Sequence, residues 1–392
     1  MEIRRLVEKE FEEADFLWLQ SFERGTLSSL GGLARYRDGF EHRMVRFGLW
    51  DEAGMQATLQ MYTTLMQFEP GLVLPSTYIS SIACAPARRG RGYGGACLRY
   101  ALEHMRDAGQ LLTTICPFEF AYYRQFGWEW VNIRRSYRVP SRALRPVPET
   151  DSVRAAGKQD RKAIEEVYRR IGRGYRGMAV RDEAEWDLIL SDSKSHLSYV
   201  YVYEGDEGIE GYLVLRGGGS EETWLPEFIA LNIKARQALL GLLSRLHMQA
   251  KWFTWQAPED DGFWSEMFHH DMQTSVGTTL QGRVVDIASA LTALKPAPGR
   301  KGEFVLGVRD PFASWNDRRW QVSIADGAVN VEPTTAEAQV SMDIQAFSQA
   351  FFGALPVSKL RDRQRMEVES EDAFNVLRSL LDGPPMWSNG PF

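Results

Sequence analysis

The chain has 392 residues, a length that is too great for one ordinary core and predicts two or three domains. Hydrophobic residues make up 44% and charged residues 25%, the balance of a globular protein, which excludes a disordered chain. A formal charge of −6 without a long run of Lys and Arg excludes nucleic acid as a partner and favours a cationic substrate.

Residues 1–145 are predicted to form an α/β domain. The expected elements are, in chain order, a strand over 2–7, a helix over 12–22, hairpin strands over 46–50 and 55–62, a strand over 77–84, a helix over 92–108, a strand over 111–116, a short helix over 119–125 and a final strand over 132–139. Asp51 and Gly54 suit the hairpin turn, and Gly109 suits the end of the long helix.

Prolines at 140, 146 and 148 mark a linker, after which the order of elements repeats over residues 150–280. This second α/β domain is predicted to contain hairpin strands over 197–203 and 209–215, a strand over 222–230, a helix over 234–249 and a strand over 251–256. Residues 283–392 are predicted to form an α+β domain with strands over 304–308, 320–325 and 328–331 and helices over 344–352 and 371–381.

Neither a targeting segment nor a metal site is predicted. Residues 1–16 carry acids and lack the apolar core of a signal peptide, and no stretch reaches 18 apolar residues. Cys84, Cys97 and Cys116 lie in apolar runs without a CxxC pair, so neither disulfides nor zinc are expected. The histidines that lack partners at metal-ligand spacing, and are expected to be structural, are His104, His269 and His270. We therefore expect a cytoplasmic protein without a membrane partner.

The most informative segment is a glycine-rich basic turn between the strand that ends at Cys84 and the following helix. Alternating glycines let consecutive N–H groups converge, and the helix N-terminus adds the positive end of its dipole. The glycines are Gly90, Gly92 and Gly94, and the surrounding arginines are Arg88, Arg89 and Arg91. The turn predicts pyrophosphate binding. The alternative is that the glycines only allow the chain to turn and bind no ligand. The corresponding turn of the second domain, Ile229–Lys234, has neither glycines nor an arginine cluster, so we expect that domain to lack the cofactor site.

The spacing Arg89-x-x-Gly92-x-Gly94 resembles the coenzyme A signature of the GNAT superfamily of N-acetyltransferases. The resemblance implies that acetyl-CoA binds with its pyrophosphate on the N–H groups of Arg89–Gly95 and with its acetyl group against Ile82–Cys84. The residues assigned in this way to cofactor binding are Ile82, Ala83, Cys84, Arg89, Gly90, Arg91, Gly92, Tyr93, Gly94 and Gly95.

The pattern Tyr123-x-x-Phe126-Gly127-Trp128 resembles the stretch that these acetyltransferases place beside the acetyl sulfur. When an amine attacks a thioester, the leaving thiolate needs a proton, and a phenol with a pKa of about 10 can donate one. Tyr123 is therefore the predicted general acid. Packing of the aromatic side chains beside a bend is the structural alternative.

Together these features resemble the Eis family (enhanced intracellular survival), in which an acetyltransferase domain, a second and degenerate one, and a sterol-carrier-protein-like domain are joined. The resemblance spans the whole chain and implies a homo-oligomer, a trimer or a hexamer. It also implies an unusual base, the terminal carboxylate of Phe392, with a water relay as the alternative. The apolar, turn-rich segment 386–392 is typical of a tail that docks.

We expect an N-acetyltransferase that moves an acetyl group from acetyl-CoA to a primary amine by direct attack in a ternary complex. The acceptor is a small molecule or a peptide: an aminoglycoside, a polyamine or a lysyl peptide. The alternative is a non-catalytic protein that senses coenzyme A or binds an apolar ligand in its last domain. Polar residues that interrupt the strands of that domain disfavour an apolar cavity: Ser323, Asp326, Asn330 and Glu332.

Overall fold

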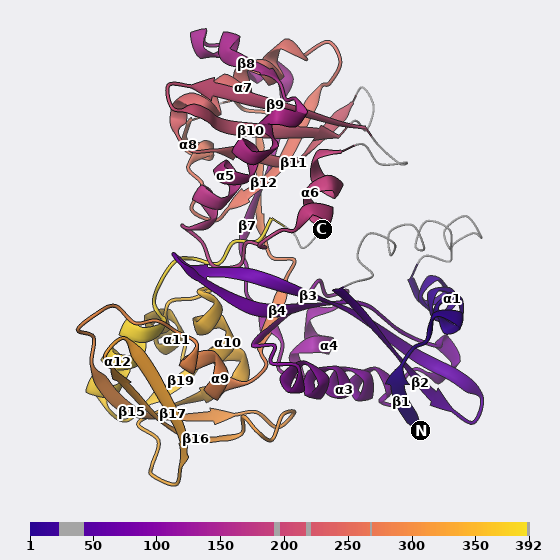
Figure 1. The fold of residues 1–392 in the computed structure, drawn as a ribbon, viewed down its shortest axis with the longest axis vertical. Coiled ribbons are helices and arrows are strands. Elements are labelled where there is room, and N and C mark those ends of the chain that lie inside the picture. The colour runs from indigo at the N-terminus through magenta and orange to yellow at the C-terminus, as the bar shows by residue number, and fades with distance from the viewer. Residues whose placement is uncertain (23–42, 192–196, 217–220, 267–268, 390–392) are drawn as a thin grey trace. The chain divides into compact units, whose positions relative to one another are not determined.

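The computed structural model describes residues 1–22, 43–191, 197–216, 221–266 and 269–389 (Figure 1). The chain divides into two compact units. The first consists of Met1–Met66, Leu72–Val131 and Thr279–Gly383, and the second of Gln67–Gly71, Asn132–Thr278 and Pro384–Phe392. Among the described residues, no helix has both the length and the apolar composition that a membrane crossing needs.

The first unit contains a seven-stranded mixed sheet in the order β1-β2-β3-β4-β5-β14-β6. Its strands are β1 (Glu2–Arg5), β2 (Met44–Asp51), β3 (Gly54–Glu69), β4 (Leu72–Cys84), β5 (Leu112–Ile115), β6 (Glu129–Trp130) and β14 (Gln281–Val284). The helices that go with this sheet are α1 (Phe11–Phe22), α3 (Tyr93–Asp107) and α4 (Phe120–Arg124).

Helix α3 connects two parallel strands, β4 and β5, whereas β1, β2 and β3 pair antiparallel. The fully buried residues of α3 recur every three or four positions, so one face of the helix covers β2 and β4. These residues are Cys97, Leu98, Ala101, Leu102 and Met105. The predicted helix over 92–108 is therefore confirmed, and the long amphipathic pattern explains why it could be predicted.

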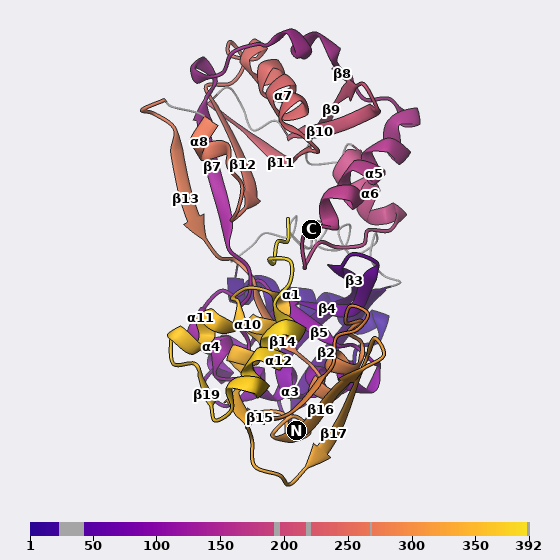
Figure 2. The ribbon, with the colours of Figure 1, turned by 90° about the vertical axis from the view of Figure 1, so that its left-hand side faces the viewer.

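Strand β14 comes from far along the chain and completes this first sheet. It lies between β5 and β6 and pairs antiparallel with both strands. Helix α10 (Ile344–Phe352) packs on β14 (Figure 2). The helix can approach closely because Gly282 has no side chain: a Cβ atom there would lie 3.0 Å from the Phe352 ring. A strand from after residue 280 therefore belongs to the sheet whose strand β4 leads into the glycine-rich turn.

The strand predicted over 132–139 as the end of the first domain forms as β7 (Arg134–Pro140), but it lies in the second sheet. It pairs antiparallel with β12 (Trp252–Pro258) and β13 (Gln273–Gly277). Tyr137 and Val139 are buried in the core of the second unit. The prediction was wrong about the partner because alternating burial specifies a strand but not the sheet that it joins.

The second unit contains a seven-stranded sheet in the order β13-β7-β12-β11-β10-β9-β8. Its further elements are β8 (Val153–Ala155), β9 (Ser198–Gly205), β10 (Gly208–Arg216), β11 (Glu222–Ala230), α5 (Arg161–Gly172), α6 (Glu183–Leu190), α7 (Ile233–Arg245) and α8 (Phe263–Glu266). The predicted succession of hairpin, strand, helix and strand is confirmed by β9, β10, β11, α7 and β12. As in the first sheet, the helix joins two parallel strands, here β11 and β12.

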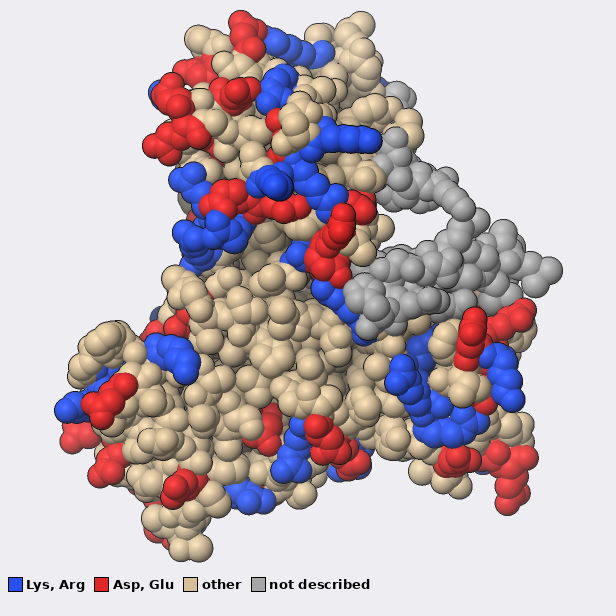
Figure 3. Space-filling model, in the orientation of Figure 1, with Lys and Arg blue, Asp and Glu red and all other residues tan. Residues whose placement is uncertain are grey.

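A five-stranded sheet in the order β17-β16-β15-β18-β19 follows β14 in the first unit and confirms the predicted α+β region. Its strands are β15 (Gly302–Arg309), β16 (Arg318–Ala325), β17 (Ala328–Thr334), β18 (Val340–Asp343) and β19 (Met366–Val368). Besides α10, its helices are α9 (Ile287–Thr292), α11 (Val357–Asp362) and α12 (Glu371–Leu381). On the face drawn in Figure 3, basic side chains lie next to acidic ones over both units.

Candidate active site

Strands β4 and β5 separate at one end of the first sheet. They pair in parallel from Ser76 with Leu112 to Ile79 with Ile115, where β5 ends. Strand β4 continues to Cys84, so its last residues have no partner on the β5 side. Ser81 in this part of β4 has φ of +49°, a left-handed conformation that costs a non-glycine residue about 1 kcal/mol or more and is concentrated at functional sites. The separation exposes main-chain polar groups of β4 to a ligand.

A cavity of about 600 Å³, here called the loop cavity, lies between the end of β4 and the start of α3. This volume is within the range of roughly 300–1,000 Å³ that is usual for small-molecule sites. All predicted cofactor-binding residues except the exposed Arg91 line it. Two further lining residues, Arg88 and Phe126, belong to the turn and to the aromatic pattern that the sequence indicated. The lining residues that the sequence analysis did not assign to the site are Ser21, Phe22, Phe118, Tyr122 and Gln125.

The glycine-rich turn is shaped as an anion site. Gly90 and Gly92 have φ of +78° and +81°, values that favour glycine and turn successive N–H groups to one side. Gly92 caps α3, which has no acidic residue in its first turn. Within the described part of the chain, the N–H groups from Gly90 to Gly95 donate to no acceptor. The helix end therefore presents free amides and a positive dipole end to the loop cavity.

Asp51 in the β2–β3 turn holds this loop in place. Its carboxylate accepts a hydrogen bond of 3.0 Å from the Tyr93 hydroxyl and lies 3.9 Å from the Arg88 guanidinium. The Ala53 amide, followed by Tyr93 and the nearby arginines, holds the pKa of Asp51 below its usual value. Arg89 donates to the Ser21 carbonyl at 3.4 Å. Two of the three predicted arginines are thus tethered beside the loop.

Gly94 and Gly95 have a second role that the sequence did not reveal. A Cβ atom on Gly94 would overlap the Tyr122 hydroxyl, and one on Gly95 would lie 3.0 Å from the Phe126 ring. The start of α3 therefore approaches the aromatic side chains of the α4 segment as closely as glycine allows. This contact brings the amides of the turn and the predicted acid segment to the same cavity wall.

Tyr123 lies at the end of α4, where Gly127 closes the helix with a left-handed φ of +92°. The Trp128 amide donates to the Tyr123 carbonyl at 3.3 Å and the Gly127 amide to the Arg124 carbonyl at 3.0 Å. This is the Schellman arrangement, in which Gly follows the helix end and an apolar residue then packs back on the last turn. Trp128 and Tyr123 share one core cluster. The Tyr-x-x-Phe-Gly-Trp pattern is thus a helix stop that fixes Tyr123.

The Tyr123 side chain lines a second cavity of about 300 Å³ in the gap between the ends of β4 and β5, together with Ser80, Ser81 and Cys116. This cavity shares Phe22, Ile82 and Phe118 with the loop cavity. Tyr123 is only 1% exposed, and burial raises the pKa of its phenol. Its hydroxyl has no hydrogen-bond partner among the residues that the structure describes. The phenol is therefore a protonated and unengaged donor beside the β4 main chain.

Tyr122, the neighbour of Tyr123, is a site residue that sequence reasoning missed. It lines the loop cavity, whereas Tyr123 lines the smaller one, and the two rings meet edge to face at 5.0 Å. Burial also raises the pKa of Tyr122. The only signal in the sequence was the adjacency of two tyrosines, which does not tell which side of α4 each one occupies.

The second unit has a counterpart of this gap with different chemistry. Strand β11 pairs with β12 only as far as Leu225 and then continues to Ala230 beside a cavity of about 270 Å³. The Asn232 side chain caps α7 by accepting a hydrogen bond of 2.9 Å from the Ala235 amide. This amide is therefore already satisfied, unlike those of the glycine-rich turn. Five aromatic side chains line this cavity: Tyr175, Phe228, Trp255, Phe263 and Trp387.

Phe392, predicted as the base, lies outside the described residues, and its role stays a prediction. The preceding part of the tail is held in the second unit. The Trp387 amide donates to the Arg176 carbonyl at 2.8 Å, and the Trp387 side chain is 4% exposed. The Asn389 side chain donates to Glu227 at 2.6 Å and accepts from the Tyr168 hydroxyl at 3.3 Å. The described part of the tail is therefore bound to the second unit.

The predicted structural histidines include one close group. Ligand atoms of His269, His270 and Asp271 lie within 4.8 Å of one another on the surface of the second unit. The Asp271 carboxylate pairs with Arg142, and the Asp271 amide donates to His269 Nδ1 at 3.2 Å. The ion pair with Arg142 and the hydrogen bond to His269 hold Asp271 in this position.

Comparison with known proteins identifies three domains. Residues 2–131 and 177–284 each match an acetyltransferase (GNAT) domain, and residues 287–389 match a sterol carrier protein domain. The N-acetyltransferase Eis of Mycobacterium tuberculosis is 24% identical over 343 residues, which cover 81% of each chain. Crystal structures of a GCN5-related N-acetyltransferase from Anabaena variabilis and of Eis1 from Mycobacterium abscessus each cover 100% of both chains, with TM-scores of 0.85 and 0.77 and identities of 16% and 18%.

The order of these domains confirms the succession that the sequence predicted, two acetyltransferase domains followed by a sterol-carrier-protein-like one. The cavity lined by the glycine-rich turn lies within the first of them. The chain therefore carries two GNAT acetyltransferase domains followed by a sterol carrier protein domain, and over most of its length it is similar to the N-acetyltransferase Eis.

Proposed function

We propose that the first acetyltransferase domain transfers an acetyl group from acetyl-CoA to a primary amine by direct attack in a ternary complex. The observation that carries the proposal is the loop cavity, where free amides from Gly90 to Gly95 meet the N-terminus of α3. Such a cradle fits a pyrophosphate, because several N–H donors and a helix dipole act on one doubly charged group. Arg88 and Arg89 add positive charge at its rim.

In the proposed reaction a carbon–nitrogen bond replaces a carbon–sulfur bond, the thiolate gains a proton and the amine loses one. The amine nitrogen attacks the thioester carbonyl carbon, the carbon–sulfur bond breaks, and the thiolate takes a proton from the Tyr123 phenol. The amine loses its proton to the Phe392 carboxylate or to water, and that proton restores the phenol. The β4 main chain from Ser80 to Cys84 would hold the thioester in the gap. Positioning of the two reactants contributes up to about 7–11 kcal/mol when the geometry is ideal.

A panel assay tests the proposed activity directly. Release of the coenzyme A thiol from acetyl-CoA is followed with aminoglycosides, polyamines and lysyl peptides as acceptors. We expect thiol release that depends on the presence of at least one of these amines. Binding of coenzyme A without amine-dependent release would favour the alternative of a non-catalytic protein. The sterol-carrier-protein-like domain would then be the part to examine for an apolar ligand.

Gly94→Val is expected to weaken acetyl-CoA binding at least about tenfold, a loss of roughly 1.4 kcal/mol. A side chain at residue 94 would overlap the Tyr122 hydroxyl and push it toward the loop cavity. Isothermal titration measures the change in Kd. Ala108→Val, at the exposed far end of the same helix, is the matched control and should bind as the wild type does. Equal Kd values for the two variants would contradict the proposed cradle.

The pH dependence of kcat should lack an alkaline decline. Burial raises the pKa of Tyr123 above the usual value of about 10, so the donor form persists as the pH rises. We expect kcat to increase with pH as the amine loses its proton and then to stay level up to about pH 10. Steady-state rates with one amine across this range provide the profile. A descending limb near about pH 8 would contradict a buried, protonated acid.

The predicted trimer or hexamer is retained as part of the proposal. Light scattering coupled to size-exclusion chromatography determines the oligomeric state, and a monomer at micromolar concentration would contradict it.

A further inference from the structure

Helix α4, which carries Tyr123, is too short to hold its own position. It has five residues, fewer than an isolated helix needs to be stable in water. The carbonyl groups in its last turn also lack partners within the helix. The placement of Tyr123 against the β4–β5 gap therefore depends on the helix stop at Gly127 and on contacts made by other parts of the chain.

Three side-chain donors from residues after 280 bind the main chain of the α4 segment. Gln281 Nε2 donates to the Phe120 carbonyl at 3.1 Å, at the start of the helix. Gln345 Nε2 donates to the Arg124 carbonyl at 2.9 Å, at its end. The Arg283 guanidinium donates to the Phe126 carbonyl at 2.5 Å, in the turn that closes it. We call these three donors the α4 clamp. They come from β14 and α10, so both ends of α4 are held from the last part of the chain.

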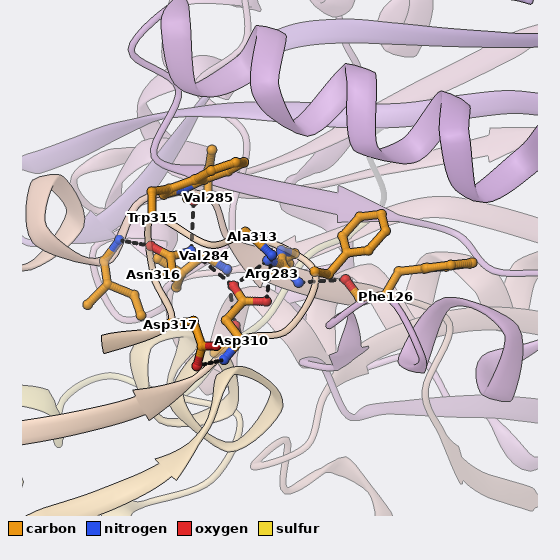
Figure 4. A network of polar contacts seen from close by, with 12 residues as sticks. Phe126, Arg283, Val284, Val285, Asp310, Ala313, Trp315, Asn316 and Asp317 are labelled. Carbon is orange, nitrogen blue, oxygen red and sulfur yellow. Dashed lines mark hydrogen bonds and ion pairs between the residues drawn. The ribbon is translucent and has the colours of Figure 1, made fainter. Parts of the chain in front are cut away.

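A buried network fixes the central member of the α4 clamp (Figure 4). Arg283 and Asp310 are both fully buried and form an ion pair at 2.5 Å. The Asp310 carboxylate also accepts hydrogen bonds from the Asn316 amide group at 3.1 Å and from the Ala313 main chain at 3.2 Å. Asn316 in turn donates to the Val285 carbonyl at 3.1 Å. The guanidinium is thus held rigidly by residues that follow β14.

Gly127 allows the guanidinium to reach its carbonyl partner. A Cβ atom at this position would overlap the Arg283 side chain. The glycine therefore serves both the left-handed helix stop and the approach of Arg283. Phe126 packs on Phe312 at 5.0 Å between ring centres, which adds an apolar contact between the same two segments.

We infer that Gln281, Arg283 and Gln345 are positioning residues for Tyr123. The sterol carrier protein domain takes part in this positioning, because it supplies Gln345 and also Asp310, the ion-pair partner of Arg283. This inference rests on the proposed role of Tyr123 as the acid. Each hydrogen bond of the α4 clamp is accepted by a main-chain carbonyl of the α4 segment, and none involves the Tyr123 side chain. The clamp thus fixes the position of the phenol and leaves its hydroxyl free to donate to the leaving thiolate.

Gln345 offers the sharpest test because it is only partly buried. Gln345→Met removes the donor and keeps the length of the side chain. Gln349→Met is the control and is the more demanding substitution, because Gln349 is fully buried one turn further along α10. Its amide group donates to the Trp130 carbonyl at 3.1 Å, outside α4. We expect Gln345→Met to lower kcat roughly tenfold with an unchanged KM for acetyl-CoA, since small displacements of a catalytic group cost that much or more. Gln349→Met should leave kcat unchanged.

A double-mutant cycle separates positioning from general structural damage. In a Tyr123→Phe background, Gln345→Met should have no further effect on kcat, because the group that it positions is gone. If the fold-reduction of kcat in the double variant equalled the product of the fold-reductions in the two single variants, the inference would be overturned. A wild-type kcat for Gln345→Met would overturn it as well. An unchanged kcat for Tyr123→Phe alone would instead contradict the proposed role of Tyr123 as the acid, and the inference that rests on this role would then fail as well. The single variants therefore distinguish the two failures.

Discussion

Tyr123→Phe is expected to lower kcat by about 100-fold or more while changing the Kd for acetyl-CoA by less than about threefold. The phenol is 1% exposed, has no hydrogen-bond partner among the described residues and stands in the gap between β4 and β5. Its removal takes away the proton for the leaving thiolate but none of the donors of the glycine-rich turn. Steady-state kinetics and isothermal titration measure the two effects separately.

Two further tyrosine variants control for this result. Tyr100→Phe, on α3 and packed on Phe47 at 5.1 Å, lies outside both cavities and should keep the wild-type kcat. Tyr122→Phe distinguishes the two neighbours on α4. If Tyr122→Phe abolished turnover and Tyr123→Phe did not, the acid would be the residue that lines the loop cavity.

Arg283→Met is expected to lower the free energy of unfolding of the first unit by about 3–5 kcal/mol, because it leaves the Asp310 carboxylate buried without its ion pair. Both side chains are fully buried, and the Phe126 carbonyl would also lose its donor. Urea unfolding at neutral pH measures the change. The exposed pair of Arg319 and Glu337 provides the control, and Arg319→Met should have little effect.

The double variant Arg283→Met with Asp310→Asn identifies the source of this loss. An amide at position 310 carries no charge and still accepts a hydrogen bond, so part of the lost stability should return. A double variant that is less stable than Arg283→Met alone would contradict the explanation by an unpaired buried charge.

The sequence was sufficient to predict features that depend on short stretches of the chain. The conformation of the glycine-rich turn follows from its glycines, and helix α3 follows from its amphipathic periodicity. The side of the loop cavity that β4 and the turn form could therefore be predicted, whereas the side that α1 and the α4 segment form could not. The succession of hairpin, strand, helix and strand in the second unit could be predicted from the sequence in the same way. Each of these signals belongs to a single turn, strand or helix, where turn chemistry and periodicity determine the structure.

Features that depend on distant partners could not be predicted. Strand β14 enters the first sheet from a position more than 150 residues after β5, and its four residues carry no sign of that partner. Strand β7 was predicted but assigned to the wrong sheet for the same reason. Arg283 was noted only as the start of the last region, because its burial against Asp310 and its bond to Phe126 appear only in the folded chain.

The most direct test compares the affinities of acetyl-CoA and S-acetylpantetheine by isothermal titration against the wild-type protein. The two thioesters share the acetyl group and the pantetheine arm, but only acetyl-CoA has the diphosphate for the amides of residues 90–95. If the turn is a diphosphate cradle, acetyl-CoA should bind at least about 100-fold more tightly, a difference of roughly 2.7 kcal/mol. Equal affinities for the two compounds, or no binding of acetyl-CoA, would contradict it.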